Sequence, residues 1–345
     1  MSDLIARIDG AAGRITLNRP KVLNALTYDM CLQIEVLLDQ WETDPNVVVI
    51  ILDAAGERAF CAGGDIAAMY ETANVGDFEY GRRFWTDEYR LNAKLAASPT
   101  PIVSFLHGFT MGGGVGLGCH VSHRVVCENS QIAMPECGIG LVPDVGGSLL
   151  LARAPGHFGE YLGTTMGRMG PADAIFMGFS DHYIPQSHWP AVIQSICDTG
   201  TVDAITKAAI DPGPAPLTQI KAEVTKFFRG EYFGDIVINL QHSGGVFAIE
   251  TLKKLSKLSP LSMAATTEMI HRVRGLNGIM PALEMEYRFT YRSAEQGDFI
   301  EGIRAMVIDK DRSPKWQHSL TDSLLPAASA MLRPLGAQTL DLTET

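Results

Sequence analysis

The spacing of apolar and polar positions changes along the chain, and it predicts where strands and helices lie. Residues 4–9 and 14–18 flank a turn of glycine and alanine, a pattern typical of a β-hairpin. Residues 26–41 then keep their apolar side chains on one helical face. The unbroken β-branched run at 47–52 follows, and it predicts a strand buried on both faces.

Two further apolar runs, at residues 101–106 and 124–127, also predict buried strands, with helical segments between them. This alternation of strands and helices indicates an α/β core with parallel strands. We expect that core to occupy residues 1–190.

The composition changes after about residue 185, and residues 187–275 and 281–308 are mainly helical in pattern. We therefore expect residues 191–345 to form a helical C-terminal region that belongs to the same functional unit. The tail from Leu320 is rich in Ser, Ala and Pro, which predicts only partial order.

Glycines gather in two clusters, Phe60-Cys-Ala-Gly-Gly-Asp-Ile66 and His107-Gly-Phe-Thr-Met-Gly-Gly-Gly-Val-Gly-Leu-Gly118. Each follows a predicted strand and precedes a predicted helix, so each presents backbone N–H groups at a helix start. Two such donors directed at one point form an oxyanion hole. The alternative is that the glycines only permit tight turns and close packing.

Other glycine motifs are missing from the sequence. The absence of any Gly-Lys dipeptide excludes a P-loop, and the absence of G-x-S-x-G argues against a serine hydrolase.

Two acids, Glu136 and Asp144, stand in an apolar stretch that is rich in Gly and Pro. Burial raises the pKa of a carboxyl group and suits it to act as a base or a nucleophile. The alternative is that each acid caps a turn or helix, because Asp144 precedes a predicted helix from Val145.

Together these residues resemble the enoyl-CoA hydratase/isomerase (crotonase) superfamily, beginning at Ile15-Thr-Leu-Asn-Arg-Pro-Lys-Val-Leu-Asn-Ala-Leu26 and continuing through both glycine clusters. The resemblance implies an α/β fold, a crotonase-like spiral of ββα turns with a helical C-terminal region. It also implies that Gly64 and Gly113 supply the two donors of the oxyanion hole. The neighbouring Ala62, Asp65 and Ile66 are expected to bind substrate.

Within that superfamily the chain resembles the 3-hydroxyisobutyryl-CoA hydrolase subfamily. Hydratases carry a glutamate where this chain has Gly116, whereas their second glutamate matches Glu136. The hydrolases combine that glycine with Pro135-Glu136 and with Pro143-Asp-Val-Gly-Gly147, and a third acid of theirs matches Glu88. Taken alone, Glu88 reads as a solvated helix residue. The subfamily implies a β-hydroxyacyl-CoA thioester as substrate and a place in valine catabolism.

The resemblance implies a role for each acid. Glu136 is expected to activate water or to attack the thioester itself, Asp144 to orient Glu136 or the substrate hydroxyl, and Glu88 to hold that hydroxyl. Lys21, Lys310 and Lys315 are expected to bind the phosphates of coenzyme A, which is part of the substrate and not a redox cofactor. A homotrimer is a further expectation from the superfamily. The alternatives are a hydratase or isomerase of the same superfamily, and an acyl-CoA binder without activity.

The net charge of −11 argues against nucleic acid and anionic membranes as partners. The six cysteines form no C-x-x-C pair and read as reduced, buried thiols, and no metal site is expected. The N-terminal residues lack the pattern of a signal or transit peptide, and no apolar run has the length of a membrane span, about 18 residues. A cytoplasmic location is therefore expected.

Overall fold

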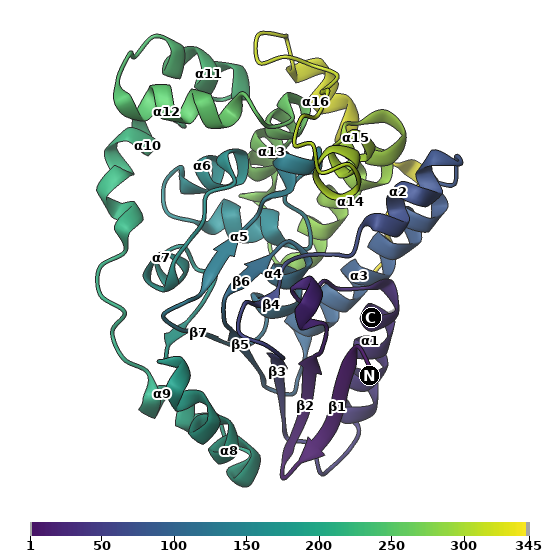
Figure 1. Cartoon of the computed structure of the whole chain (residues 1–345), viewed down its shortest axis with the longest axis vertical. Helices are drawn as coiled ribbons and strands as arrows, with labels where there is room; N and C mark the ends of the chain where they lie inside the picture. Colours follow the sequence, from purple (N-terminus) through teal and green to yellow (C-terminus); the bar gives the residue numbers. More distant parts are fainter. Residues whose placement is uncertain (1, 343–345) are drawn as a thin grey trace.

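The computed structural model describes residues 2–342, which form two β-sheets surrounded by helices (Figure 1). The strands are β1 (Leu4–Asp9), β2 (Ala12–Leu17), β3 (Val49–Ala54), β4 (Ala59–Cys61), β5 (Ile102–Leu106), β6 (Phe109–Met111), β7 (His123–Val126), β8 (Gln131–Ala133) and β9 (His182–Tyr183). The larger sheet has the order β1-β2-β3-β5-β7-β9, and the smaller has the order β4-β6-β8.

The helices are α1 (Tyr28–Glu42), α2 (Ala67–Asn74), α3 (Glu79–Ala97), α4 (Gly113–Gly118), α5 (Gly147–Arg153), α6 (Phe158–Thr165), α7 (Pro171–Phe176), α8 (Trp189–Thr199), α9 (Asp203–Ala208), α10 (Lys221–Phe227), α11 (Phe233–Gln241), α12 (Val246–Leu255), α13 (Pro260–Val273), α14 (Ile279–Gln296), α15 (Phe299–Ile303) and α16 (Leu325–Met331). A π-helical turn, Arg304–Ile308, continues α15. In Figure 1 the helices from α11 to α16 gather at the end of the molecule opposite the tip of the β1–β2 hairpin.

The chain winds as a spiral of ββα turns, which confirms the fold predicted from the sequence. The pairs β3–β4, β5–β6 and β7–β8 each place their first strand in the large sheet and their second in the small one. Apart from the antiparallel β1–β2 hairpin, neighbouring strands within each sheet run parallel. Because every turn enters the sheets in the same direction, the ends of β4 and β6 lie beside each other, and both glycine clusters follow them.

The predicted boundaries differ from the structure at the hairpin and at the first helix. Strand β2 begins at Ala12, two residues earlier than predicted, because Ala12 pairs with both β1 and β3. Helix α1 begins at Tyr28 because the hydroxyl of Thr27 accepts a hydrogen bond from the N–H of Met30.

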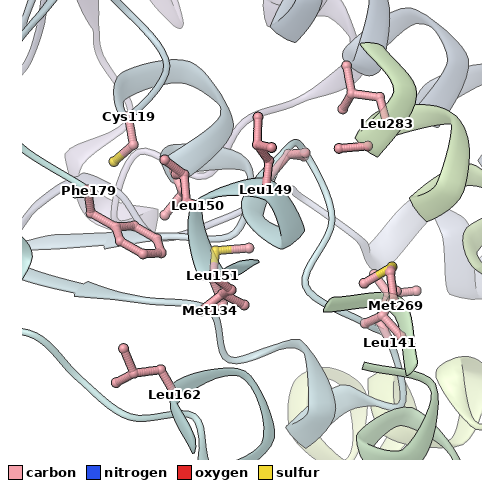
Figure 2. Packing of buried hydrophobic residues seen from close by; sticks show 14 of the residues in the cluster. Cys119, Met134, Leu141, Leu149, Leu150, Leu151, Leu162, Phe179, Met269 and Leu283 are labelled. Carbon is pink, nitrogen blue, oxygen red and sulfur yellow. The ribbon is translucent and has the colours of Figure 1, made fainter. Parts of the chain in front are cut away.

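One buried apolar cluster reaches from Leu4 to Leu342 and joins the spiral to the C-terminal helices. Figure 2 shows a part of it, in which Leu149, Leu150 and Leu151 of α5 share a packed region with Met269 of α13 and Leu283 of α14. The division at residue 190 stays a prediction, since the core continues across it.

The tail is more ordered than its composition predicts. Residues 325–331 form α16, which packs against α13 and buries Ala328 and Met331. Small side chains allow this close approach, so a segment rich in Ala and Ser packs where a neighbouring helix offers an apolar face. Within residues 2–342 no helix has the length and apolar character needed to cross a bilayer.

Candidate active site

A cavity of about 420 Å³ opens where the two glycine clusters meet helix α3 and the segment after β8. Eight of the residues predicted for the site line it: Ala62, Gly64, Asp65, Ile66, Glu88, Gly113, Glu136 and Asp144. They come from four separate stretches of the sequence, and the fold brings them around one volume. Such a concave, largely apolar pocket with a few polar groups is typical of a small-molecule site.

The loop after β4 is held by the segment before α1. Leu26 pairs with Gly64 as an isolated parallel bridge, in which the N–H of Leu26 donates to the carbonyl of Gly63 and the N–H of Asp65 donates to the carbonyl of Leu26. In such a bridge the groups of Gly64 itself point to the opposite side. Arg19 supports the same loop through an ion pair of 3.0 Å with Asp65. The N–H of Gly64 is therefore directed away from this support.

Gly113 lies on the free side of that loop. It is the first residue of α4, so its N–H has no partner inside the helix. A methyl group built on Gly113 would lie 3.3 Å from the nitrogen of Gly64 and 2.9 Å from Oε1 of Glu88. The two backbone segments thus lie close together, and a side chain on Gly113 would project into the gap between Gly64 and Glu88.

Three carboxyl groups line the cavity from different elements. Glu88 comes from α3, Glu136 from the short helical turn after β8, and Asp144 from the loop before α5, and each is at most 5% exposed. A methyl group on Gly112 would lie 2.8 Å from Oε1 of Glu136. Glu136 and Glu88 therefore stand over adjacent glycines, Gly112 and Gly113.

One oxygen of Glu136 and one of Glu88 are buried and have no hydrogen-bond partner within residues 2–342. Buried carboxylate oxygens are normally satisfied, so these two are available to a polar group that enters the cavity. This arrangement disagrees with the reading of Glu88 as a solvated residue. Sequence periodicity places Glu88 on α3 but does not reveal that this helix turns it toward the cavity.

Asp144 has a partner that the sequence did not reveal. The hydroxyl of Tyr89 donates a hydrogen bond of 2.8 Å to Oδ2 of Asp144, and Thr290 of α14 lies 3.4 Å from the same hydroxyl. The N-cap residue of α5 is Gly146 and no side chain caps this helix, so Asp144 is not its N-cap. Tyr89 sits directly after Glu88 in α3, and only the fold indicates its role.

Glu286 of α14 is a second buried acid that sequence reasoning missed. Its carboxylate accepts hydrogen bonds from the N–H groups of Gly146 at 2.8 Å and Ser148 at 3.0 Å. It thereby holds the loop that carries Asp144. Val145 in that loop has a φ of 52°, a left-handed conformation that is costly for a β-branched residue. Helix α14 therefore fixes a strained loop beside the cavity.

Burial governs the protonation of these acids. Burial, and then the charge of Asp144, raise the pKa values of both Glu88 and Glu136 well above the ordinary range. Burial raises the pKa of Asp144 to about 7, although the hydrogen bond from Tyr89 opposes this rise. Burial thus favours the neutral form of all three carboxyl groups, and the pKa of Asp144 at about 7 lies in the range that suits general acid–base chemistry.

The Tyr89–Asp144 bond leads to a prediction on pH dependence. The hydroxyl of Tyr89 favours the charged form of Asp144, so Tyr89→Phe should move the pKa of Asp144 above about 7. If turnover needs the charged form, the acidic limb of its pH profile should move to higher pH. Profiles of kcat for both proteins test this, and Tyr183→Phe, remote from the cavity on β9, is the control. An unchanged acidic limb with lowered turnover at every pH would contradict it.

The position at which hydratases carry an acid is filled by neighbouring residues. A methyl group on Gly116 would lie 2.7 Å from Cβ of Val145 and 2.8 Å from Nδ2 of Asn92. The amide of Asn92 is fully buried, and neither its nitrogen nor its oxygen has a partner within residues 2–342. Asn92 and Val145 thus exclude a side chain at Gly116.

The three lysines predicted to bind phosphate do not line the cavity. Lys21 is exposed and adjoins Val22, which does line it. Lys310 and Lys315 are exposed on the segment after the π-helical turn, and that turn contributes Met306 and Val307 to the cavity wall. Their roles stay predictions.

The described residues show no group of three or more His, Cys, Asp or Glu arranged to hold a metal ion. His120 instead lies 2.9 Å from the carbonyl of Val145 through its ring nitrogen. The six cysteines are free and buried, in agreement with the sequence.

Comparison with known proteins places this geometry in a family. The enoyl-CoA hydratase/isomerase family matches residues 12–330. Curated relatives include 3-hydroxyisobutyryl-CoA hydrolase, mitochondrial, of Bos taurus, with 38% identity over 92% of this chain and 84% of the bovine protein. The human protein of the same name has 37% identity over 89% of this chain and 82% of its own length.

Two solved structures are similar over nearly the whole chain. An enoyl-CoA hydratase from Rhodobacter sphaeroides has a TM-score of 0.92 and 48% identity, covering 99% of this chain and 100% of its own. A carnitinyl-CoA dehydratase from Mycobacterium thermoresistibile has a TM-score of 0.94 and 36% identity, covering 100% of both chains.

These comparisons contradict the expected cytoplasmic location. The bovine and human relatives are both named as mitochondrial, and so are the corresponding chicken and rat proteins. The expectation rested on the missing signal, transit and membrane-span patterns, and such an absence does not establish a compartment. The spiral fold, the paired glycine clusters and the family match over residues 12–330 agree: the chain belongs to the enoyl-CoA hydratase/isomerase family, the crotonase superfamily, and is related over most of its length to the 3-hydroxyisobutyryl-CoA hydrolases.

Proposed function

We propose that the protein hydrolyses a short β-hydroxyacyl-CoA thioester, with 3-hydroxyisobutyryl-CoA as the preferred candidate, to the free hydroxy acid and coenzyme A. One observation carries the proposal: of the two acid positions of a hydratase, this chain keeps only Glu136, since the second is Gly116 and is closed by Val145 and Asn92. The names of the curated relatives support the same substrate.

In this proposal the thioester oxygen accepts hydrogen bonds from the N–H groups of Gly64 and Gly113. These donors stabilise the negative charge that develops on the oxygen when the carbonyl carbon is attacked, at about 3 kcal/mol per donor. The donors are fixed by the Leu26 bridge and by α4, so they need no rearrangement during the reaction.

Glu136 is the proposed catalytic acid–base group. In one route it takes a proton from water, whose oxygen bonds to the carbonyl carbon while the C–S bond breaks and the thiolate receives the proton. In the other route its carboxylate bonds to the carbonyl carbon, the C–S bond breaks and the coenzyme A thiolate leaves; water then cleaves the resulting anhydride to the hydroxy acid and the Glu136 carboxylate, and the thiolate takes up a proton. Asp144 orients Glu136 or the substrate hydroxyl, and Glu88 binds that hydroxyl. Coenzyme A enters as part of the substrate.

The test measures two reactions of the same protein. With 3-hydroxyisobutyryl-CoA and a thiol reagent, we expect release of free coenzyme A. With crotonyl-CoA we expect little loss of enoyl absorbance. Hydration of crotonyl-CoA at a rate that equals or exceeds thiol release from 3-hydroxyisobutyryl-CoA would refute the hydrolase proposal. Binding of both thioesters without either reaction would identify an acyl-CoA binder.

A hydratase is the second candidate, favoured by the 48% identity to a structure named enoyl-CoA hydratase. Such an enzyme would have to work with Glu136 and without an acid at residue 116. The same pair of assays separates the two candidates.

The closed space at Gly116 gives a prediction on stability. Gly116→Glu should lower the melting temperature and should not create hydration activity, because its Cβ would meet the branched Cβ of Val145 at 2.7 Å. Overpacking of this kind costs typically about 1–3 kcal/mol. Thermal unfolding of Gly116→Glu and of Gly116→Glu with Val145→Ala measures it, and the double variant should recover part of the loss. A stable Gly116→Glu protein that hydrates crotonyl-CoA would contradict the prediction.

A further inference from the structure

A second cavity lies under helix α8, on the face of the large sheet that points away from the candidate active site. Its volume is about 400 Å³, and none of its lining residues also lines the first cavity. Helix α8 packs on this face and forms a separate buried apolar cluster with β3, β5 and β7. Because side chains alternate along a strand, Asp53 of β3 and His107 after β5 continue the apolar rows of this cluster. We call the space lined by Arg14, Asp53, His107 and Trp189 the α8 cavity.

Two buried polar atoms in the wall of the α8 cavity have no hydrogen-bond partner within residues 2–342. They are Oδ1 of Asp53, a residue 7% exposed, and Nε2 of His107, a residue 3% exposed. The ring of His107 also forms a hydrogen bond with the backbone of Gly56, so Nδ1 donates to that carbonyl and Nε2 is left as an acceptor. Burial lowers the pKa of His107, which favours this neutral form. Buried polar atoms are normally paired, so the wall presents two acceptors to a donor that enters.

Arg14 places a guanidinium group beside these acceptors. Its Nε donates a hydrogen bond of 2.7 Å to Oδ2 of Asp53, which leaves Oδ1 of that carboxylate for another donor. Its Nη1 lies 3.9 Å from Oδ2 of Asp9, beyond hydrogen-bond distance. Among the described residues, Arg14 and Asp53 are the only Lys, Arg, Asp or Glu that line the cavity, so the charges of its wall cancel. A ligand with no net charge but with both a donor and an acceptor end matches this wall.

The remaining wall is apolar and is held in place. The indole N–H of Trp189 donates a hydrogen bond of 2.9 Å to the carbonyl of Ile184, so the ring offers the cavity only its apolar surface. The centroid of that ring lies 6.2 Å from the centroid of the His107 ring, in an edge-to-face arrangement. The carbonyl of His107 accepts a hydrogen bond of 2.8 Å from the N–H of Phe60. Ile193 of α8 extends the apolar surface, which can therefore pack against an aliphatic group.

We propose that the α8 cavity binds a small zwitterion, an α-amino acid with an aliphatic side chain. The ammonium group of the ligand donates to Oδ1 of Asp53 and to Nε2 of His107, and its carboxylate accepts from Nη1 of Arg14. Hydrogen bonds between charged groups are stronger than those between neutral groups, so these contacts fix the orientation of the ligand. The aliphatic side chain packs on Trp189 and Ile193. This binding goes beyond the proposed hydrolysis and does not depend on it.

The experiment titrates the full chain by calorimetry with three compounds of similar shape. L-Leucine carries both charged groups, isoamylamine lacks the carboxylate, and 4-methylpentanoate lacks the ammonium group. We expect L-leucine to bind at least tenfold more tightly than either of the others. A hydrogen bond to a charged group contributes enough free energy to change affinity by about tenfold or more.

Three variants locate the ligand. His107→Asn keeps an N–H for the carbonyl of Gly56 but lacks Nε2, so it should bind L-leucine about tenfold more weakly. Gln194→Trp places a large ring at an exposed residue that lines the cavity, so it should block binding while the fold is retained. Arg7→Gln is the matched control, because Arg7 pairs with Arg14 across the β1–β2 ladder but does not line the cavity. Its affinity should not change, and melting temperatures establish that each variant is folded.

The absence of saturable binding of L-leucine to the parent protein would overturn the proposal, since the two acceptors would then be paired with water only. Isoamylamine that binds as tightly as L-leucine would overturn it too, because the carboxylate would have no part in recognition. Unchanged binding of L-leucine to both His107→Asn and Gln194→Trp would place the ligand elsewhere and have the same consequence, as would an equal loss in Arg7→Gln. None of these measurements uses thiol release, so their outcome is separate from that of the hydrolase proposal.

Discussion

Glu136→Gln should reduce turnover of the CoA thioester by about 10²–10⁴-fold, the contribution typical of a positioned proton-transfer group. Glutamine has the size of glutamate but neither accepts a proton as a base nor attacks as a carboxylate. Substrate affinity should change little, because Glu136 does not contribute to holding the distant parts of coenzyme A. Single-turnover and steady-state measurements of thiol release give kcat and KM separately.

Stability provides the control for Glu136→Gln. Burial raises the pKa of Glu136 above its unfolded value, so the stability it contributes is complete below the unfolded pKa and is lost as pH rises through the folded pKa. Glutamine has no such penalty, and the variant should melt no lower than the parent at pH 8. Native turnover in a fully folded variant, or a large fall in melting temperature that accounts for the lost activity, would refute the role of Glu136.

Asp144→Asn extends this test. If Asp144 acts through Glu136, the double variant Glu136→Gln with Asp144→Asn should lose little more turnover than Glu136→Gln alone, because residues that act as a unit are not additive. Fully additive losses would indicate that the two acids act independently.

Gly113→Ala keeps the backbone N–H but should still lower turnover, by as much as the loss of one oxyanion donor, about 10²–10³-fold, because its methyl group obstructs the oxyanion position. The new methyl group would lie 2.9 Å from Oε1 of Glu88 and 3.3 Å from the nitrogen of Gly64, in the space proposed for the thioester oxygen. The companion Gly113→Pro removes the N–H itself, and proline is tolerated at the first position of a helix. Both variants should therefore lose turnover, Gly113→Ala because its methyl group obstructs the oxyanion position and Gly113→Pro because it lacks the donor.

The fold should survive Gly113→Ala. The nearest neighbour of the added methyl is the end of a flexible glutamate side chain, and alanine favours a helix more than glycine does. Gly234→Ala in α11 is the matched control, since no atom lies within 4 Å of its added Cβ. Retained thiol release by folded Gly113→Ala and Gly113→Pro would exclude the donor role, and circular dichroism establishes folding.

The sequence by itself determined the parallel α/β core and the pieces of the site that lie within one motif. Unbroken β-branched runs such as residues 47–52 are typical of strands that are buried on both faces. Glycine clusters that follow such strands predict exposed backbone N–H groups at the starts of the next helices. The resemblance of these motifs to the crotonase superfamily added the pairing of Gly64 with Gly113. The family comparison confirms the superfamily, while the roles of individual residues remain proposals.

Only the tertiary structure decided which acids share the cavity and what supports them. Tyr89 lies 55 residues before Asp144, and Glu286 lies 140 residues after Gly146, so their hydrogen bonds leave no periodic signal in the sequence. The elements packed around α3 decide which of its side chains are buried. The helical pattern alone predicts that Glu88 is exposed to solvent, whereas the fold buries it. A residue's burial and pKa are set by neighbours brought together through packing, and those neighbours are distant in the chain.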